Sequence, residues 1–405
     1  MEYWEFVHGS ADVDTSALRL AYGARKSSVC FDFEDAVTQI EARRKSRRKI
    51  PWFTGHDRFR FPSQQAAEQA SNQAVALYHS VIVGKGNHIA DLTAGLGIDA
   101  MTLALAGNRV DAFEMDANRA EALRQNADEL KLENFSIHCA DSIKYLKDNP
   151  GLRFDCLFID PARRDSEGRR IFRLQDSLPN VIENMPWLLR HAPKILVKGS
   201  PLLDITQTIR DLGMLECGIQ IEAVSYRGEV KEVLVLMQDS KAEVTVSVTD
   251  IADAPDFPDG EAVVNYRYAA GVATGGPVRL ACIDDVVPGR YLYEAGAGMR
   301  KLNCAPLICA SYPDIKALSP DGELFVSDML HTDFPGRVNV IKDIVSGKEA
   351  KRLQGERLRI VSSRYPLSAE ELRRKYKLRE GDALSLYATS LCGSKKMMIL
   401  AEKVL

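Results

Sequence analysis

Short apolar runs alternate with amphipathic segments between about residues 87 and 240. Six runs have the length and composition of strands: HIADLTAG, RVDAFEM, FSIHCAD, FDCLFIDPA, KILVKGSP and KEVLVLMQD. The segments between them carry apolar residues at helical spacing, as in IDAMTLALA, ANRAEALRQNADELK, SLPNVIENMPWLLR and LLDITQTIRDLG. Strands that alternate with helices are typical of a doubly wound, mostly parallel sheet, so we expect an α/β fold.

The flanking regions have different patterns. Residues 1–86 predict a helical region, in which Ser63 is placed to cap one helix over QQAAEQASNQAVALYHSVIVG. Residues 241–330 contain prolines and glycines typical of turns, and they predict a linker followed by a small α/β module. Residues 331–405 predict a last α/β domain with the strands GRVNVIKDIV, RLRIVSSRY, ALSLYATS and KKMMILAEKV and the capped helix SAEELRRKY.

Composition and charge narrow the function classes. The 405 residues are 45% hydrophobic and 27% charged, which is enough apolar material for several cores and excludes a disordered chain. The 53 Lys and Arg against 56 Asp and Glu give a net charge of −3, so any nucleic-acid surface has to be local. The eight cysteines form no CxxC pair, which excludes a zinc ribbon or disulfide scaffold, and we expect no metal. Because no apolar run is long enough to cross a membrane and MEYWEFVHGS lacks a signal h-region, we expect a cytoplasmic protein with no membrane partner.

The first predicted strand runs into a glycine-containing turn. The segment is Asp91-Leu-Thr93-Ala-Gly95-Leu-Gly97-Ile-Asp99, and it opens the next helix. Glycines allow a ligand to approach the backbone, and the helix N-terminus offers free N–H groups. Taken alone, the turn is equally consistent with a structural tight turn and a ligand site.

Acidic residues also close the next three strands. They are Glu114, Asp141 (followed by Ser142) and Asp160. Ligands of doubly wound sheets bind at the carboxyl ends of strands, where Glu114 can hold both ribose hydroxyls and Asp141-Ser142 can reach an adenine amine. Any one of these acids is also consistent with a solvated loop or a helix cap. Four acidic strand ends in register with the glycine turn predict a nucleoside cofactor site.

These segments resemble the motifs of class I S-adenosylmethionine-dependent methyltransferases. DLTAGLGID resembles their first motif, FEMD the second, CADS the third and DPAR the fourth, over residues 87–240. The whole chain is similar to a bacterial family of candidate methyltransferases with a THUMP-like C-terminal domain, through AAEQASNQAVA, DPARR and LVKGSPLLD. The resemblance implies S-adenosyl-L-methionine as cofactor, a seven-stranded methyltransferase sheet, a ferredoxin-like module within residues 241–330 and a THUMP-like end at residues 331–405. It implies no defined substrate.

The fourth motif is the candidate catalytic segment. Asp160-Pro161-Ala162-Arg163 stands where amino-directed methyltransferases carry (D/N/S)PP(Y/F/W/R). A carboxylate there accepts a hydrogen bond from an exocyclic amine and orients the nitrogen toward the methyl donor. The second proline and the aromatic residue are missing, which weakens the case for adenine. Arg163 and Arg164 either contact a base or phosphate, or belong to a solvated turn.

The fifth strand tests a covalent mechanism. Pyrimidine-C5 methyltransferases carry a nucleophilic cysteine after this strand, where this chain has Lys198-Gly-Ser-Pro. Cys156 lies inside the fourth strand and is expected in the core, so we expect direct transfer. Lys198 either contacts a substrate phosphate or is an exposed strand-end residue.

Basic residues cluster in RRKSRRK (residues 43–49), around Arg163 to Arg173, and in ELRRKYKLR near Arg373. Such clusters are either solvated faces or local phosphate contacts. We therefore expect a cytoplasmic methyltransferase that transfers a methyl group to a base amine of RNA (rRNA or tRNA), guanine before adenine. The alternatives are a non-catalytic RNA-binding protein on the same fold and a small-molecule or protein methyltransferase. The sequence does not define the oligomeric state.

Overall fold

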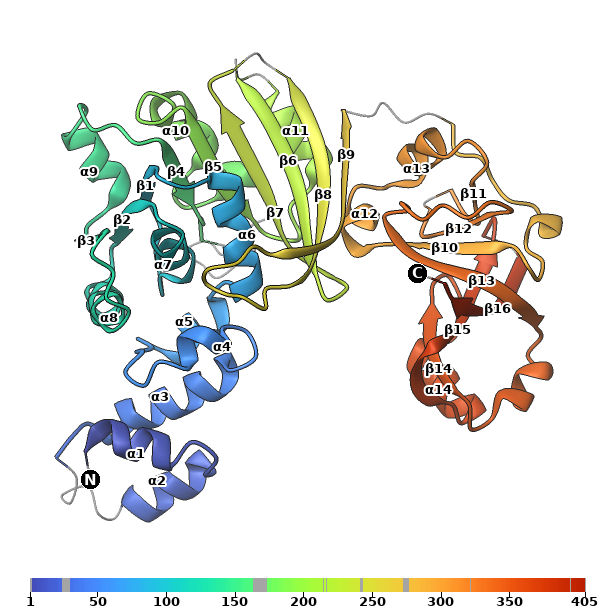
Figure 1. The fold of residues 1–405 in the computed structure, drawn as a ribbon, viewed down its shortest axis with the longest axis horizontal. Helices are drawn as coiled ribbons and strands as arrows, with labels where there is room; N and C mark the ends of the chain where they lie inside the picture. Colours follow the sequence, from blue (N-terminus) through green and yellow to red (C-terminus); the bar gives the residue numbers. More distant parts are fainter. Residues whose placement is uncertain are drawn as a thin grey trace. The chain divides into compact units, whose positions relative to one another are not determined.

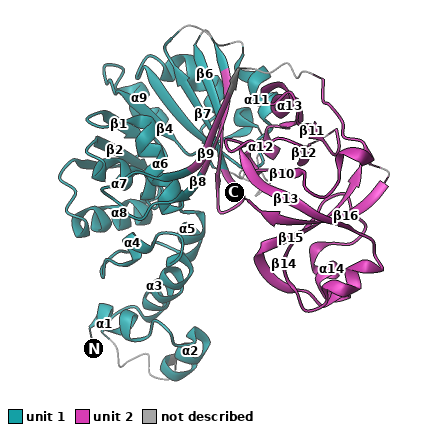
Figure 2. Ribbon diagram, turned by 45° about the vertical axis from the view of Figure 1, so that its right-hand side comes forward, with its two compact units in different colours: residues 1–221, 232–244, 251–264 teal, residues 222–231, 245–250, 265–405 magenta. Residues whose placement is uncertain are grey.

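The computed structural model describes residues 2–23, 30–162, 173–213, 215, 217–240, 243–271, 277–320, 322–393 and 395–404. The chain divides into two compact units, coloured teal and magenta in Figure 2. Unit 1 contains residues 1–221, 232–244 and 251–264, and unit 2 contains residues 222–231, 245–250 and 265–405. The expected four-part division of the chain stays a prediction. None of the helices in the described ranges is long and apolar enough to cross a bilayer.

The first sheet confirms the predicted α/β architecture (Figure 1). Its order is β3-β2-β1-β4-β5-β7-β6, continued by β8 and β9, which makes it two strands longer than the expected seven. Neighbouring strands pair in parallel from β3 through β5, whereas β7 is antiparallel to β5. The strands are β1 (His88–Asp91), β2 (Arg109–Glu114), β3 (Phe135–Cys139), β4 (Cys156–Ile159), β5 (Lys194–Gly199), β6 (Gly218–Tyr226), β7 (Glu229–Gln238), β8 (Val244–Asp253) and β9 (Val263–Gly271).

The order of these strands reverses between β1 and β4, which creates the crevice where ligands of doubly wound sheets bind. Every residue of β4 is buried, as expected for a central parallel strand with both faces covered. α8 packs on β2 and β3, and α6 packs against α7. The covering helices are α6 (Gln73–Val83), α7 (Ile98–Leu105), α8 (Ala117–Glu129), α9 (Ser142–Asp148), α10 (Val181–Leu188) and α11 (Ile205–Leu212).

The single helix predicted after Ser63 is wrong, because the segment forms two helices. The Ser63 side chain accepts a hydrogen bond from the Ala66 N–H and caps α5 (Gln64–Gln69). The chain then becomes extended at Ala70, and Asn72 caps α6 by accepting from the Ala74 N–H. Asparagine competes well for helix N-caps, so the local cap outweighs the helical propensity of this Ala-rich segment.

The N-terminal helices confirm the predicted helical region. Phe6, Val7, Val37 and Ile40 are buried among aromatic neighbours in one core. The helices are α1 (Tyr3–Gly9), α2 (Thr15–Gly23), α3 (Phe33–Ser46) and α4 (Pro51–Thr54), followed by α5.

The first basic cluster serves mostly internal contacts rather than one open cationic face. The Arg43 guanidinium donates to four backbone carbonyls at 2.7–3.1 Å, those of Thr54, His56, Asp57 and Phe59. The other internal contacts join Arg44 to the carbonyls of Ala11 and Val13, Lys45 to the Glu68 carboxylate, and Lys49 to the Glu68 carbonyl. Arg43 is therefore neither part of a solvated face nor free for a phosphate contact, and both predictions are wrong for it. Arg47 and Arg48 are exposed.

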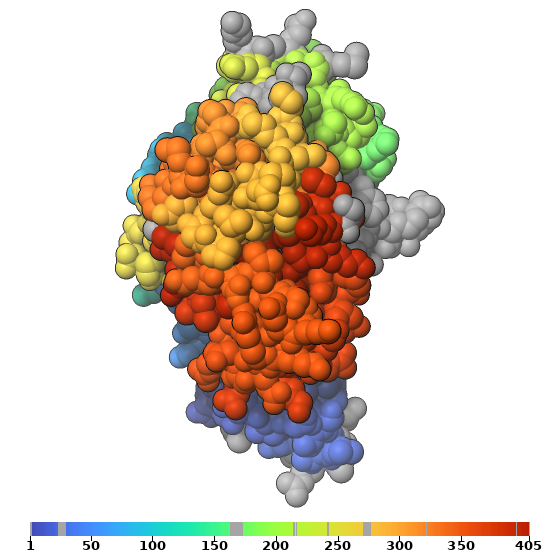
Figure 3. Space-filling view, turned by 90° about the vertical axis from the view of Figure 1, so that its right-hand side faces the viewer, coloured from blue at the N-terminus to red at the C-terminus, as the bar shows by residue number. Residues whose placement is uncertain are grey.

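Unit 2 is built on a second sheet, in the order β11-β12-β10-β13-β16-β15-β14. Most of its pairs are antiparallel, and β14 and β15 are parallel. Figure 3 shows one face of this unit in space-filling form, with the segments of the sheet coloured orange to red. The elements are β10 (Tyr291–Ala295), α12 (Ala297–Lys301), α13 (Ala305–Ser311), β11 (Lys316–Ala317), β12 (Leu324–Ser327), β13 (Gly336–Val345), β14 (Arg357–Ser362), α14 (Ala369–Tyr376), β15 (Arg379–Leu391) and β16 (Lys395–Lys403).

An ion pair joins β10 to β14, the strand at one edge of this second sheet. Glu294 on β10 accepts two hydrogen bonds from the Arg359 guanidinium on β14, at 2.6 and 2.8 Å. The Tyr387 hydroxyl on β15 donates to the same carboxylate at 2.9 Å. A bidentate pair with a third donor satisfies a buried carboxylate and sets the registration of the strands that carry it. The four strands and the helix predicted after residue 331 appear as β13 to β16 and α14.

Arg43→Ala should destabilise the protein by about 3 kcal/mol, because four partly buried carbonyls lose a charged donor. Arg48→Ala is the matched control from the same cluster and should change the free energy of unfolding by less than about 0.5 kcal/mol. Urea unfolding followed by circular dichroism measures both values. Equal values for the two variants would contradict a structural role for Arg43.

Candidate active site

A cavity of about 1120 Å³ lies in unit 1 at the carboxyl ends of β1, β2 and β4. It collects the predicted cofactor residues from three separate parts of the sequence. Its wall is completed by α5 on one side and by the segment before and within α10 on the other. Among the lining residues are Asp91, Thr93, Gly95, Gly97, Asp99, Glu114, Asp141, Ser142, Asp160, Pro161, Leu178 and Leu202.

The glycine turn lies at the floor of this cavity. Gly95 and Gly97 have φ values of +57° and +86°, which L-residues with a side chain rarely adopt. A Cβ on Gly97 would lie 2.1 Å from the Leu123 Cδ1 atom of α8, so the absence of a side chain also allows α8 to pack closely. Gly97 is the N-cap of α7, whose first N–H groups lie beside the cavity. The turn therefore combines close backbone approach with a helix N-terminus.

The acidic ends of β2 and β3 line the same cavity. The Glu114 Oε1 atom accepts from the Asp116 N–H at 2.8 Å, which holds the side chain in place. Asp141 caps α9 by accepting from the Lys144 N–H, and the Ser142 hydroxyl donates to the Leu92 carbonyl at 2.8 Å. Asp141 is therefore both the N-cap of α9 and a residue that lines the cavity.

Asp91 at the end of β1 is the most strongly shifted acid on the cavity wall. Its Oδ1 atom accepts from the Thr93 N–H at 2.9 Å, and the residue is 2% exposed. Burial raises the pKa of Asp91 to about 8, opposed by this hydrogen bond and increased by the nearby Asp99 and Asp160 carboxylates. Asp91 therefore presents a protonated carboxyl group to the cavity at neutral pH.

Asp160 follows β4 and is held at two atoms. Its N–H donates to the Thr93 Oγ1 atom at 2.6 Å, and its Oδ2 atom accepts from the Lys198 ammonium at 2.7 Å. The parallel register that pairs Ile159 with Val197 brings these two strand ends together. The Asp160 side chain keeps 26% of its surface exposed, on the cavity side.

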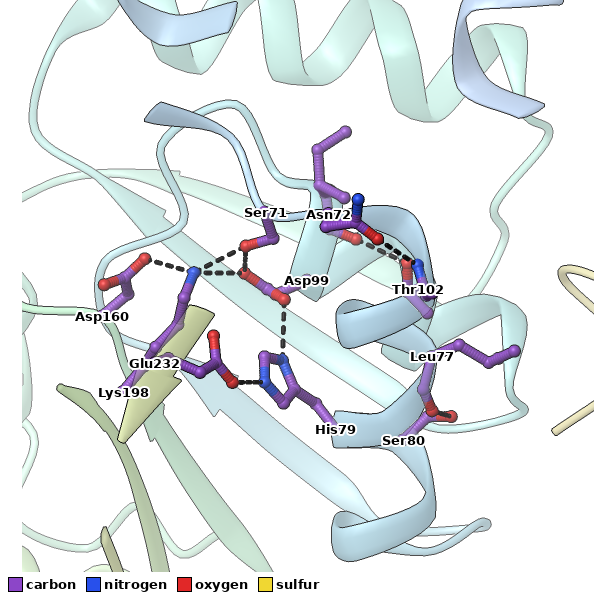
Figure 4. Close-up of polar contacts among 12 residues, drawn as sticks. Ser71, Asn72, Leu77, His79, Ser80, Asp99, Thr102, Asp160, Lys198 and Glu232 are labelled. Atoms are coloured by element: carbon purple, nitrogen blue, oxygen red, sulfur yellow. Dashed lines mark hydrogen bonds and ion pairs between the residues drawn. The ribbon is translucent and has the colours of Figure 1, made fainter. Parts of the chain in front are cut away.

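The structure corrects both expectations for Lys198. It is 3% exposed, and its ammonium donates to the Ser71 Oγ at 2.6 Å, the Asp160 Oδ2 at 2.7 Å and the Asp99 Oδ2 at 3.2 Å (Figure 4). These contacts use the three donors of the ammonium group. Lys198 is therefore not an exposed strand-end residue, and its ammonium is already occupied where a phosphate contact was expected.

The polar network continues inward from Asp99 (Figure 4). Asp99 also accepts from the Ser71 hydroxyl, and its Oδ1 atom bonds the His79 Nδ1 atom at 2.8 Å. The His79 Nε2 atom contacts the Glu232 carboxylate of β7. The carboxylate oxygens of Asp99 are thus bonded to protein groups, although the residue was predicted to bind cofactor and does border the cavity.

Charge complementarity dominates the titration of this network. Burial would lower the pKa of Lys198, but the Asp160, Asp99 and Glu232 carboxylates raise it above the usual lysine value. Burial would also lower the pKa of His79, yet Glu232 and Asp99 raise it to about 10. Burial opposes ionisation of Asp99, and Lys198 and His79 still hold its pKa below the usual range. Lys198, His79 and Asp99 are consequently charged at neutral pH.

Sequence reasoning missed Ser71, His79 and Glu232. A charged residue inside an otherwise apolar strand was the available signal for Glu232 in KEVLVLMQ. Ser71 and His79 lie in the segment that was expected to be one helix, where apolar spacing cannot show which polar side chains are buried. Arg163 and Arg164, predicted to act on the substrate, lie outside the described residues.

Cys156 confirms the expected core position. It is 1% exposed in β4, and burial raises the pKa of its thiol to about 12. Since the thiolate is the nucleophilic form of cysteine, Cys156 is unsuited to covalent catalysis.

The geometry of the whole chain matches a known structure. A crystal structure of a candidate methyltransferase from Porphyromonas gingivalis W83 aligns with a TM-score of 0.79 at 24% identity, covering 100% of this chain and 98% of that one. The protein has a class I methyltransferase fold. Residues 336–403 match the THUMP domain-like family. This match confirms the prediction of a THUMP-like C-terminal domain.

One curated relative is also similar in sequence. An uncharacterized RNA methyltransferase of Mycoplasma mobile is 27% identical over 137 residues, which is 32% of this chain. The match spans 36% of that relative's own length, about a third.

Asp91→Asn should flatten part of the pH dependence of stability. The folded chain keeps the Asp91 proton up to a pH of about 8, whereas the unfolded chain releases it near pH 4. Between these values the folded state binds more protons, so Asp91 lowers stability as pH rises. The measured quantity is the difference in free energy of unfolding between Asp91→Asn and the wild type. This difference should increase in favour of Asp91→Asn by at least about 1 kcal/mol from pH 5 to pH 8.

Urea unfolding at several pH values measures this difference. Asp128→Asn, on the exposed part of α8, supplies the baseline for a surface carboxyl group. Parallel curves for Asp91→Asn and the wild type would show that Asp91 is ionised in the folded state.

Proposed function

We propose that this chain is an S-adenosylmethionine-dependent methyltransferase that transfers a methyl group directly to a base amine of RNA, guanine before adenine. The observation that carries the proposal is one cavity that joins a nucleoside-type wall to a fixed, partly exposed carboxylate, that of Asp160. The methyltransferase fold supports the proposed reaction class, and the positions of the site residues support the roles proposed for them.

The cofactor side of the cavity suits an S-adenosylmethionine molecule, which supplies an electrophilic methyl group when bound. The Asp116 N–H holds the Glu114 Oε1 atom, and the other carboxylate oxygen would accept from the ribose hydroxyls. Gly95 and Gly97 leave the turn backbone uncovered for the amino-acid part of the cofactor. The acidic wall favours its ammonium and sulfonium charges, and the cavity volume exceeds what a nucleoside of this size needs.

The target side presents a hydrogen-bond acceptor between apolar surfaces. Leu178 and Leu202 are 55% and 47% exposed, and both line the cavity. The bridge between Ala162 and Leu178 keeps the first of them close to Asp160. Apolar side chains that border a cavity beside one acceptor suit a flat, amine-bearing ring, and they take the place of the missing aromatic residue.

Asp160 performs the positioning step in this proposal. An exocyclic amine shares its lone pair with the ring and is a poor nucleophile until that conjugation is weakened. Asp160 accepts one amine hydrogen and thereby favours the tetrahedral nitrogen that in-line attack requires. Pro161 restricts the backbone of the turn through its fixed φ.

RNA is the proposed substrate class on two supports. Residues 336–403 are THUMP-like, and the Mycoplasma mobile relative is named as an RNA methyltransferase. Comparing modified nucleosides of rRNA and tRNA from parent and deletion cells by mass spectrometry tests the assignment. One methylated base that disappears in the deletion strain and returns with the gene is the expected result. An unchanged nucleoside profile argues for a protein or small-molecule substrate.

Glu114→Ala should weaken S-adenosylmethionine binding by roughly 1.5–3 kcal/mol, because a charge-assisted contact to two hydroxyls is lost. Isothermal titration calorimetry measures the affinity. Glu121→Ala, an exposed glutamate of α8 bonded to Arg124 and Gln125, should bind as the wild type does. Equal affinity for Glu114→Ala rejects the ribose contact, and no binding by the wild type rejects the cofactor.

Asp160→Ala should lower the methyl-transfer rate by roughly 10²–10³-fold, as expected when one positioned hydrogen-bonding group is removed. Cofactor affinity should change little, because the carboxylate lies on the target side of the cavity. Cys156→Ser is the paired variant from β4 and should retain turnover, since no covalent adduct forms. Incorporation of labelled methyl into RNA extracted from deletion cells measures both rates. Near-normal transfer by Asp160→Ala would refute the positioning role.

A further inference from the structure

The Lys198 ammonium is buried against the back of the candidate catalytic carboxylate. Lys198 lies outside the set of residues that line the cavity, while Asp160 lines it. Its three N–H groups end on Ser71, Asp99 and Asp160, which fixes the direction of each bond. A phosphate could reach this ammonium only by displacing one of these partners.

The network around this lysine contains two cations, Lys198 and His79, and three acids, Asp99, Asp160 and Glu232. His79 is sandwiched between the carboxylates of Asp99 and Glu232, and it neutralises part of their charge. Lys198 is the cation that contacts Asp160 within the described residues. The Asp91 carboxyl group at the end of β1 also interacts electrostatically with Asp160.

Burying an ammonium group costs several kcal/mol, and a buried ion pair is often no more stable than an apolar replacement. Stability alone therefore gives a weak reason for a lysine at this position. The buried ammonium group has a functional explanation if it holds the Asp160 carboxylate in one orientation.

We propose that Lys198 is a positioning residue that acts through Asp160: it holds the Oδ2 atom, so that the Oδ1 atom faces the target amine as an acceptor. This inference rests on the proposed function of Asp160. Ser71 and Asp99 hold the other two ammonium N–H groups and so fix the lysine itself.

The separate effects on kcat and KM distinguish this role from a purely structural one. In Lys198→Gln, the Asp160 Oδ2 atom loses the ammonium that fixes it, so the carboxylate is no longer held toward the amine. The kcat should fall at least about tenfold, as expected when a positioned hydrogen-bonding group is displaced. The KM for S-adenosylmethionine should stay close to the wild-type value.

Two further variants control the comparison. Lys198→Arg keeps a charged donor beside Asp160 and should return kcat toward the wild-type value. Lys194→Met removes a lysine from the other end of β5, whose ammonium contacts the carbonyls of Ile82 and Val83, and should leave kcat unchanged. If Lys198→Gln does not fold, Lys198→Met, which replaces the polar group with an apolar chain of similar length, is measured in its place.

The assay uses the full-length protein, labelled S-adenosylmethionine and RNA extracted from deletion cells. A kcat that is lowered in Lys198→Gln at an unchanged KM, and that Lys198→Arg restores, supports the inference. An active wild type whose Lys198→Gln variant keeps the wild-type kcat, with only the melting temperature lowered, overturns the inference and leaves the proposed function intact. A wild type that transfers methyl to no RNA fraction overturns the proposed function, and the positioning role falls with it.

Discussion

The buried ammonium of Lys198 is the constraint on which the arrangement of the site depends. It joins β5 to the end of β4, to the first turn of α7 and to the segment that precedes α6. An ammonium without water around it must satisfy all three of its donors, so these four segments can occupy only a narrow range of relative positions. The geometry of the site therefore depends on the buried network around Lys198 as much as on the residues that line the cavity.

The N-terminal helical region belongs to this arrangement and does more than precede the methyltransferase sheet. Ser71 and His79 reach the charged network only because the helix breaks between α5 and α6. On the other side, the Asn126 side chain of α8 exchanges two hydrogen bonds with the backbone of Arg60. The same α8 packs against Gly97 through Leu123. Contacts from residues 60–80 thus hold both the glycine turn and the target-side carboxylate.

The elements around the cavity were largely predictable, and the network behind it was not. Parallel strands end at one edge of a sheet, so a carboxylate at the end of each of β1, β2 and β4 had to gather there, and the acid that follows β3 lies beside them. The hydrophobic periodicity and the composition of the sequence do not show whether the Lys198 side chain points to solvent or to the interior. Its direction depends on which acidic side chains of neighbouring elements lie beside it in the folded chain. Arg43 shows the same limit, since its four carbonyl partners come from a turn whose path only the folded chain defines. The break at Ala70 was missed because a favourable cap outweighed helical spacing.

The ion pair of Glu294 with Arg359 has a consequence for how far the THUMP-like segment is a module. The matched segment begins at residue 336, yet the carboxylate that satisfies Arg359 and Tyr387 lies before it, on β10. β13, the first strand of the match, also pairs along five residues with β10. A fragment cut at the boundary of the match would expose an unpaired strand edge and leave the partly exposed Arg359 guanidinium without its counter-ion. A segment that is to be transplanted or expressed as an intact unit therefore has to include β10. The residues that match the family are only a part of that unit.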